Sequence, residues 1–496
     1  MDCKEIKQGR RRILLVAPPF YRLFKDTYAL ARYPLSLGYL AGTIKKETDW
    51  DVMVYNADFI PDSEPGIKNS YMTSVGFDKY LCNLRDSSGQ VWRETKSVIL
   101  EYKPDVVGIS SMSQNFASSR IVAKLAKEIN RDTIVVVGGP HPSMVGGEVL
   151  KCRDIDICVK GEGEAAIVEL LQAIESLRTF DGIKGIVYRR NNQIIDSGPR
   201  GYIEDLDSLC FPHETAPEVL KDYDKYPPLA FKYIFATRGC PYDCFFCGSR
   251  NIWSRSARFR SPENIVKEIK SLQKRGVNSI AFEDDTFGIN KQYISRICSA
   301  IMTNCRGVKW SSELHVKLAN KEIVSLMKNA GCYSISLGIE SGNNGILKTI
   351  RKNITVEEAI AACRLVKRRG IELSAFFIVG FPQETEETLN DTIKVMKEVN
   401  SDFLVYSIFT PYPGTEAFEF CRAKGLIKED YDVSLYNHQS PANCFCMNMA
   451  PQRFRQLVSK IEKMVDRKNA PNVIKSINRS ISLNIVRKLQ ELIIKR

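Results

Sequence analysis

The stretch Arg238–Arg250, RGCPYDCFFCGSR, decides the fold. It carries three cysteines, Cys240, Cys244 and Cys247, in the spacing C-x-x-x-C-x-x-C. Three thiolates on one short loop can converge on a single metal centre. Because four thiolates would saturate a cubane iron–sulfur cluster, three leave one iron open to another ligand. Structural zinc usually takes four protein ligands, and the nearest histidine, His213, lies 27 positions before Cys240. The spacing therefore favours a [4Fe-4S] cluster over zinc or a chance grouping of cysteines.

Apolar runs alternate with helical segments from this loop onward. The runs that predict strands are Tyr233–Thr237, Ser279–Asp285, Val308–Leu314, Ser334–Ile339, Leu373–Val379 and Phe403–Phe409. Helix starts lie between them: Ser261 precedes a proline at the first helical position, and Thr355 with Glu358 matches a capping box. Six such units predict a partial parallel (β/α)6 barrel over residues 230–430. In such a barrel, reactive groups lie at the carboxyl ends of the strands.

The first third of the chain shows another alternation. It predicts strands at Ile13–Pro19, Val52–Asp58, Val106–Ser111, Ile134–Pro140 and Ile157–Lys160, with helices at Leu35–Lys46 and Ser119–Asn130. Apolar strands joined by helices imply parallel pairing, so we expect a doubly wound α/β domain over residues 1–165. A polar insertion, residues 61–95, is expected to hold a helix near Phe77–Leu84. Residues 166–229 are expected to be a linker with one hairpin, Gly185–Arg190 and Gln193–Asp196.

Composition fits a globular chain of several domains. Hydrophobic residues make up 44% and charged residues 26% of the 496 positions, which excludes disordered, collagen-like and coiled-coil chains. No run approaches 18 consecutive apolar residues, so we expect no membrane-spanning helix. The 15 cysteines are odd in number and scattered, which argues for a reducing cytoplasm rather than a disulfide framework.

The net charge of +13 is concentrated in the last residues. Residues 451–496 hold 12 Lys and Arg against 3 Asp and Glu. Within residues 431–496, one helical face carries Ile474, Ile477, Ile481, Ile485, Leu489 and Leu492. This pattern predicts a basic amphipathic helix that either docks on the body or contacts a membrane or partner surface, which would suit a lipid substrate. We find no recognised RNA-binding motif and expect no nucleic acid partner.

The cysteine loop and four strand-end motifs together resemble the radical S-adenosylmethionine (SAM) superfamily over residues 230–425. The motifs are FEDDTF at 282–287, GIESGN at 338–343, IVGFPQET at 378–385 and TPYPGTEAF at 410–418. In that family the open iron binds the amino and carboxylate groups of SAM. An electron from the cluster then cleaves SAM to a 5′-deoxyadenosyl radical. The resemblance implies an external electron donor of the flavodoxin or ferredoxin type.

The resemblance also nominates SAM-binding residues. Phe246, next to the third cysteine, matches a position close to the adenine, and Gly380 shapes a strand-end turn. The remaining candidates for contact with SAM or substrate are Asp284, Asp285, Gly338, Glu340 and Ser341. Each short motif alone would favour a solvated turn, whereas their register with the cysteines favours cofactor contact. The segment with Glu313 and His315 departs from the family pattern, and we expect His315 to be a buried structural histidine.

In the first domain, GISSMSQNF (108–116) and VVVGGPHPS (135–143) lie at strand ends. They resemble the S-x-L…G-G pattern of cobalamin-binding domains, where small residues admit the nucleotide tail of the cofactor. The positions carried over are Ser110, Ser111, Gly138 and Gly139, and GEGE (161–164) and YPLSLGYL (33–40) add to the resemblance. The D-x-H-x-x-G motif that supplies histidine to cobalt is absent, so we expect no protein ligand to cobalt or a weak one. A doubly wound fold with an empty site is the alternative.

Across nearly its whole length, the chain resembles cobalamin-binding radical SAM enzymes. The resemblance implies a methyltransferase that acts on an unactivated carbon of a small metabolite or lipid. The radical would abstract hydrogen, methylcobalamin would deliver the methyl group, and a second SAM would methylate the cobalt. Alternatives are a cyclase or ring-rearranging enzyme of the same cofactors, an RNA-modifying enzyme, or a cofactor sensor. Cys444 and Cys446 are expected to be ordinary buried thiols.

Overall fold

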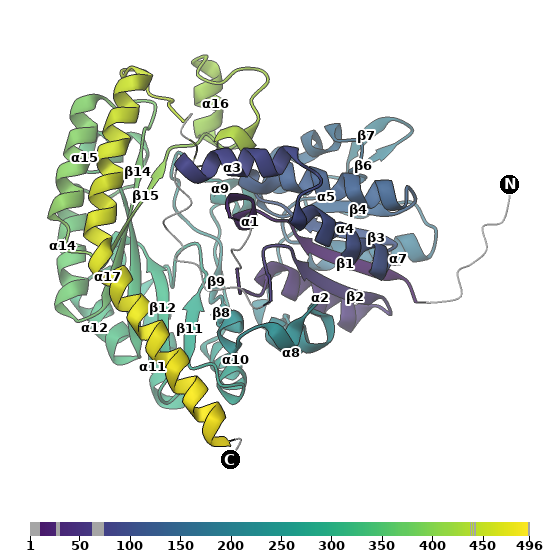
Figure 1. Cartoon of the computed structure of the whole chain (residues 1–496), viewed down its shortest axis with the longest axis horizontal. Helices are drawn as coiled ribbons and strands as arrows, with labels where there is room; N and C mark the ends of the chain where they lie inside the picture. The colour runs from purple at the N-terminus through teal and green to yellow at the C-terminus, as the bar shows by residue number, and fades with distance from the viewer. Residues whose placement is uncertain are drawn as a thin grey trace.

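Two sheets, each with helices on its faces, lie side by side in a computed structural model of the chain, and a long C-terminal helix runs along the second half (Figure 1). The structure describes residues 10–25, 30–61, 74–436, 438, 440 and 443–494. Part of the predicted insertion, residues 62–73, lies outside this range. Within it, no helix is both long and apolar enough to cross a bilayer.

The first sheet has seven strands in the order β2-β1-β3-β4-β5-β6-β7. Their bounds are β1 Arg12–Ala17, β2 Asp51–Asn56, β3 Val106–Ser110, β4 Ile134–Gly138, β5 Ile157–Val159, β6 Ile186–Arg190 and β7 Gln193–Asp196. Strands β1–β5 are parallel, as predicted. Successive side chains of a strand point to opposite faces, and β1 therefore feeds two cores: Ile13 and Leu15 enter one, Leu14 and Val16 the other.

Helices cover both faces of this sheet. One core includes side chains of α2 (Leu35–Glu47), α7 (Glu164–Glu175) and α8 (Pro212–Val219). The other includes side chains of α3 (Ser74–Arg85), α4 (Gln90–Tyr102) and α5 (Phe116–Ile129). Shorter helices are α1 (Tyr21–Phe24) and α6 (Pro140–Val145). This arrangement confirms the doubly wound α/β prediction.

Three features of this half differ from the sequence analysis. The hairpin β6–β7, expected in a linker, pairs antiparallel with β5 and extends the sheet. Helix α8 forms within the proline-containing stretch, because Pro212 occupies the first turn, where its missing N–H costs nothing. Helix α4 was not predicted. Residues 166–230 thus pack on the first half, and the domain limits themselves stay a prediction.

The second sheet is a partial parallel barrel, as predicted, with the order β15-β14-β13-β12-β11-β8. Its strands are β8 Tyr233–Ile234, β11 Ser279–Phe282, β12 Lys309–Leu314, β13 Cys332–Glu340, β14 Glu372–Val379 and β15 Phe403–Ile408. The main helices are α10 (Pro262–Lys274), α11 (Lys291–Asn304), α12 (Lys321–Asn329), α14 (Val356–Arg368) and α15 (Glu386–Glu398), and shorter ones are α9 (Ser249–Trp253), α13 (Asn344–Thr349) and α16 (Glu416–Ala423). The predicted caps are confirmed: Ser261 accepts from the amide of Asn264, and Thr355 and Glu358 form a capping box.

The first predicted barrel strand, Tyr233–Thr237, is wrong in its extent. The chain leaves the barrel sheet after Ile234 and forms a separate ribbon, in which β9 (Thr237–Arg238) pairs antiparallel with β10 (Arg258–Phe259). The physical reason is competition for backbone hydrogen bonds, since the amides of Ala236 and Thr237 donate to the carboxylate of Asp284 rather than to a neighbouring strand. The cysteine loop begins directly after β9, between the two strands of this ribbon.

The C-terminal helix α17 spans Pro451–Ile494. Phe454, Leu457 and Ile461 are buried in the barrel core, and the Asn469 side chain pairs with both backbone groups of Leu404 on β15. The first half of the helix therefore docks on the body. The predicted apolar face from Ile474 to Leu492 lies outside the side chains that the structure describes.

Candidate active site

A cavity of about 360 Å³ lies between the carboxyl ends of the first sheet and the segment that leads into the cysteine loop. Its floor is apolar, with Leu15, Ile109 and Val136 from the sheet. On the barrel side it is lined by residues of β9, α9 and the loop after β11, among them Gly239, Trp253 and Asp285. The volume falls within the roughly 300–1,000 Å³ that is common for cofactor pockets.

Three of the four positions predicted for cobalamin line this cavity: Ser110 at the end of β3, and Gly138 and Gly139 at the end of β4. Ser111 is fully buried instead, and its hydroxyl accepts a hydrogen bond from Ser119 at 3.0 Å. The cavity residues fit a cobalamin tail, because Gly138 and Gly139 leave the edge of the sheet free of side chains, and a Cβ at Gly139 would lie 2.8 Å from the carbonyl oxygen of Ser111.

No histidine, cysteine or methionine is among the described residues that line the cavity. His141, the histidine nearest in sequence to the Gly-Gly turn, is buried elsewhere. It hydrogen-bonds Ser113 at 3.0 Å and packs on the ring of Phe116. Burial lowers the pKa of His141 to about 4. His141 thus lies away from the cavity, and the expectation of no protein ligand to cobalt, or a weak one, stays a prediction.

The three cysteines of the loop are close enough to interact electrostatically, as a cluster site requires. The pKa of Cys244 is raised to about 11 and that of Cys247 to about 12, chiefly by burial and in smaller part by the neighbouring cysteines. Thiols with such values ionise when a metal centre binds them. The backbone amide of Ser249 points at the Cys247 sulfur at 3.4 Å, which is the kind of contact that tunes cluster sulfurs. The donor types suit a cluster, but no three Cys, His, Asp or Glu side chains of the described residues are arranged to hold a metal ion, and the assignment of these cysteines stays a prediction.

A buried ion pair lies beside this loop. Glu340, at the end of β13, accepts a hydrogen bond from Lys352 at 2.7 Å, and both side chains are about one-tenth exposed. Burial works against the charge on Lys352, but Glu340 and then Cys244 outweigh it and leave the pKa of the ammonium raised. Gly338 lies directly under the pair. The cysteine loop thus has a permanent cation next to it.

Three other predicted SAM residues, Phe246, Gly380 and Ser341, are half-buried or buried. Phe246 is half-buried and lies 5.7 Å, centroid to centroid, from Phe381, which follows Gly380 at the end of β14. The amide of Gly380 donates to Glu384, whose pKa is raised to about 7 by burial. Ser341 is fully buried within its turn and hydrogen-bonds Thr392.

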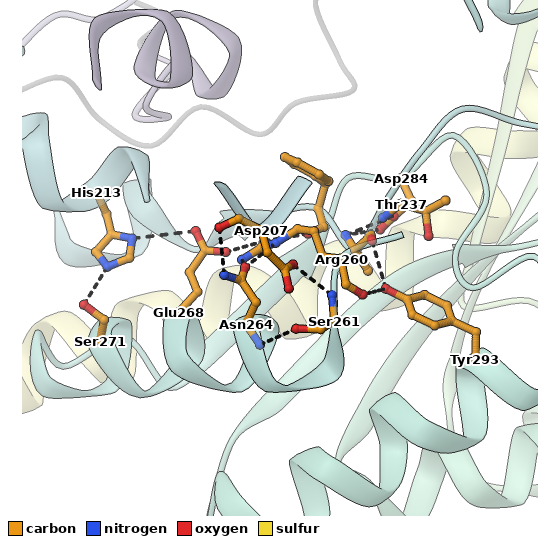
Figure 2. Close-up of polar contacts among 12 residues, drawn as sticks. Asp207, His213, Thr237, Arg260, Ser261, Asn264, Glu268, Ser271, Asp284 and Tyr293 are labelled. Carbon is orange, nitrogen blue, oxygen red and sulfur yellow. Dashed lines mark hydrogen bonds and ion pairs between the residues drawn. The ribbon is translucent and has the colours of Figure 1, made fainter. Parts of the chain in front are cut away.

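The two aspartates after β11 have different surroundings. Asp284 is buried and accepts backbone hydrogen bonds from Ala236 and Thr237, next to Tyr293, whose hydroxyl donates to the carbonyl of Ala236 at 2.9 Å (Figure 2). Burial raises the pKa of Asp284 to about 8. Asp285 lines the cavity and accepts from the hydroxyl of Ser249 at 2.9 Å. Of the two, Asp285 is thus the one available to a ligand.

His315 is buried, as the sequence analysis expected, and stacks on Tyr242 of the cysteine loop with ring centroids 3.8 Å apart. Burial lowers the pKa of His315 to about 3, so the ring is neutral. Glu313 lies on the same strand, and burial together with Glu283 and Glu340 raises its pKa to about 7.

Cys444 is half-buried, Cys446 is buried, and their side chains share a hydrogen bond. The amide of the following residue, Met447, donates to the carbonyl of Pro382. The pair therefore lies against the turn that follows β14.

Sequence reasoning missed the charged residues that join the two halves. Glu162 and Glu164, within GEGE, bind Arg238 and Arg258 of the β9–β10 ribbon. Lys352 was missed as well. The acidic pair was visible in the sequence, but its partners lie 74 to 96 positions away. No periodic pattern connects residues at such separations.

Comparisons with known proteins agree with this arrangement. A family model described as "Radical SAM superfamily" matches residues 234–396, and one described as "B12 binding domain" matches residues 71–171. An uncharacterized methyltransferase of Pyrococcus horikoshii is 31% identical over 420 residues, which cover 84% of each chain. An anaerobic magnesium-protoporphyrin IX monomethyl ester cyclase of Rubrivivax gelatinosus is 29% identical over 70% of this chain and 63% of its own.

Among solved structures, the methyltransferase TsrM of Kitasatospora setae, with cobalamin and a [4Fe-4S] cluster bound, matches with a TM-score of 0.64. The match covers 90% of this chain and 82% of TsrM at 18% identity, so it supports the fold. The two family domains indicate a [4Fe-4S] cluster with SAM in the barrel and cobalamin in the first half. With both domains in this order and a relative that matches most of its length, the chain belongs to the cobalamin-binding radical SAM enzymes.

Proposed function

We propose that this chain is a methyltransferase that transfers a methyl group to an unactivated carbon of a small metabolite or lipid. The observation that carries the proposal is the shared cavity. Gly138 and Gly139 from the cobalamin-type half, and Gly239 and Asp285 from the cysteine-loop side, line one volume. A methyl donor held there would face the strand ends at which the radical forms.

When bound, the cluster and SAM supply a 5′-deoxyadenosyl radical, and the corrinoid supplies the methyl group. The chain binds, orients and shields these groups. Cys240, Cys244 and Cys247 would hold the cluster. Lys352 would offset the negative charge of the thiolates beside it, which is a strong effect away from water. Gly138 and the apolar floor would receive the corrinoid tail and exclude water.

For SAM, the residues that support binding are those at open strand ends. Asp285 is the available carboxylate, and Phe246 of the cysteine loop packs on Phe381 just after β14. Gly380 would act through the backbone turn, since it packs on Phe454. Asp284 and Ser341 would support the site indirectly, because their polar atoms already form hydrogen bonds with other residues of the chain. Gly338 and the Glu340–Lys352 ion pair would hold the end of β13 in place beside the cysteine loop.

The substrate and partners are part of the proposal. A flavodoxin or ferredoxin type of protein would supply the electron, and the enzyme would work in the cytoplasm. A lipid substrate would suit a membrane contact through the second half of α17, whereas a water-soluble metabolite would need none.

A second candidate is a cyclase that uses the same cofactors. The observation that favours it is the match to the magnesium-protoporphyrin cyclase, which spans 70% of this chain. The two activities differ in product mass: a methyltransferase adds one CH₂ to its substrate, and a cyclase does not. Mass spectrometry of turnover mixtures would therefore separate them.

The test of the cofactor set is anaerobic reconstitution with iron, sulfide and hydroxocobalamin, read by absorption and metal counting. We expect about four irons per chain and one retained corrinoid. The control replaces Cys240, Cys244 and Cys247 by alanine and should lose iron but retain corrinoid. Four irons without retained corrinoid would overturn the methyl-transfer proposal.

A further inference from the structure

Four charged side chains join the two halves of the molecule at the wall of the cavity. Arg238 donates to Glu162 and to Glu164, both at 2.6 Å, and Arg258 donates to the second oxygen of Glu162 at 2.8 Å. Glu162 lies in the turn after β5, Glu164 is the first residue of α7, and the arginines belong to the β9–β10 ribbon. We call these four residues the interdomain clamp.

The clamp is buried and balanced in charge. Its side chains are between 3% and 13% exposed. The guanidinium of Arg238 also lies over the rings of Tyr39 and Phe235. Charges removed from water in this way depend on their partners, since an unpaired buried charge is strongly unfavourable. The two halves are therefore held in one relative placement at this point.

The clamp is connected to the cysteine loop by a single residue. Arg238 pairs with Arg258 across the ribbon, and only Gly239 separates Arg238 from Cys240. Gly239 has φ +102°, and a Cβ there would collide with the carbonyl oxygen of Ser256. Gly239 therefore packs directly against the backbone of Ser256, and this one residue joins the clamp to the first cysteine.

The clamp also borders the cavity. Glu162, Glu164 and Arg238 are among its lining residues, between Gly138 on one side and Asp285 on the other. A displacement of the ribbon would thus change both the shape of the cavity and its separation from Cys240.

Other contacts hold the halves together away from this point. Arg120 on α5 pairs with Asp432 at 3.3 Å on the surface. Met144 on α6 packs against Gly248 after the cysteine loop and against Gly414. Because these contacts remain when the clamp is removed, loss of the clamp should disturb geometry locally rather than separate the halves.

We propose that the interdomain clamp of Glu162, Glu164, Arg238 and Arg258 sets the distance between the cavity of the cobalamin-type half and the first cluster cysteine. These are positioning residues that act through the backbone of the β9–β10 ribbon. The inference rests on the proposed function for its chemical meaning, because that distance decides whether a methyl donor and a radical reach the same substrate. The connection of the clamp to Cys240 through the ribbon backbone does not depend on which reaction the enzyme performs.

The main variant is the double substitution R238Q/E164Q. It removes one positive and one negative charge together and leaves the Glu162–Arg258 pair intact, so no buried charge loses its only partner. R238K is the conservative variant, because it keeps the positive charge. One ammonium group cannot, however, reproduce the planar guanidinium that bridges two carboxylates. The control is D432N, which breaks the exposed interdomain pair with Arg120.

The first measurement is hydrogen exchange of the full chain without cofactors. We expect the amides of residues 235–240 to exchange about tenfold faster or more in R238Q/E164Q, because the buried partners that fix the ribbon are lost. R238K should fall between wild type and the double variant, and D432N should match wild type. Unchanged exchange over residues 235–240 in the double variant would overturn the link.

The second measurement reports the distance itself. After reconstitution with iron, sulfide and hydroxocobalamin and reduction by dithionite, electron spin relaxation of the cobalt(II) centre is measured in the presence of the reduced cluster. We expect a slower or more heterogeneous relaxation in R238Q/E164Q than in wild type when samples of equal iron and corrinoid content are compared. A variant that only unfolds more easily would show wild-type relaxation, and that result would refute the proposal.

The two proposals fail in different ways. If wild type retains no corrinoid, the methyltransferase proposal falls, while hydrogen exchange still decides the link between clamp and ribbon. If R238Q/E164Q loses its cofactors, R238K is used for the relaxation measurement. Wild-type relaxation in R238K together with wild-type exchange would then overturn the clamp.

Discussion

Filling the cavity at Gly138 should displace the corrinoid and leave the cluster intact. Gly138 ends β4, has ordinary backbone geometry, and would place a Cβ 3.7 Å from the Cβ of Val159. A methyl group therefore fits as an ordinary contact. The further carbons of leucine would extend into a cavity of about 360 Å³ that the corrinoid must share.

The size of the effect follows from overpacking. Forcing extra methylene groups against a filled site costs about 1–3 kcal/mol. At about 1.4 kcal/mol per tenfold, Gly138→Leu should weaken corrinoid binding about 5-fold to about 140-fold. Gly138→Ala should bind nearly as well as wild type. Gly201→Leu is the matched control, because Gly201 is exposed and no atom lies within 4 Å of its Cβ position.

The assay is titration of the anaerobic protein with hydroxocobalamin, followed by absorption of the retained cofactor, with iron counted in the same samples. Wild-type affinity in Gly138→Leu would show that the corrinoid does not occupy this cavity. A parallel loss of iron would show instead that the variant has disturbed the whole fold.

Three further outcomes are expected. Lys352→Met should destabilise the barrel by about 3–5 kcal/mol in denaturant unfolding, because it leaves Glu340 buried and unpaired, and adding Glu340→Gln should restore most of the loss. Gly139→Ala should cost about 1–3 kcal/mol in the same measurement, since its φ of +106° strains a side chain; wild-type stability would contradict this. Burial lowers the pKa of His213 to about 3, below about 6.5 in the unfolded chain, so the unfolded state binds the extra proton and stability falls as pH drops from about 6.5 towards 3. His213→Asn should make this acid slope shallower by up to about 1.4 kcal/mol per pH unit, and an identical slope would refute the assignment.

The strands and caps were predictable because their signals are local. In β1, Ile13 and Leu15 point to one core and Leu14 to the other, so a continuous apolar run correctly indicated a strand buried on both faces. Ser261 and Thr355 cap their helices through contacts within three residues. Local chemistry of this kind needs no knowledge of the rest of the chain.

Long-range choices were not predictable in the same way. The strand expected at Tyr233–Thr237 ends early, because the amide of Thr237 donates a hydrogen bond to Asp284, 47 positions later. Arg238 forms an ion pair with Glu162, which lies 76 positions earlier in the sequence. His213, at the start of α8, is fixed by Ser271 on α10 at 2.9 Å (Figure 2). A sequence pattern can nominate such charged residues, but their pairing is decided only when the elements pack.

Motif matching also leaves a choice between neighbours that physical reasoning can resolve. Neighbouring residues at a strand end can differ in what they face: Gly138 and Gly139 both line the cavity, whereas in two other pairs only one residue does. Ser110 lines the cavity and Ser111 is buried, and Asp285 lines it while Asp284 binds backbone amides. In each pair, the residue turned inward fixes the backbone that presents the outer one. The family motif therefore combines a ligand-facing residue with its support, and substitutions at the two positions should separate cofactor affinity from stability.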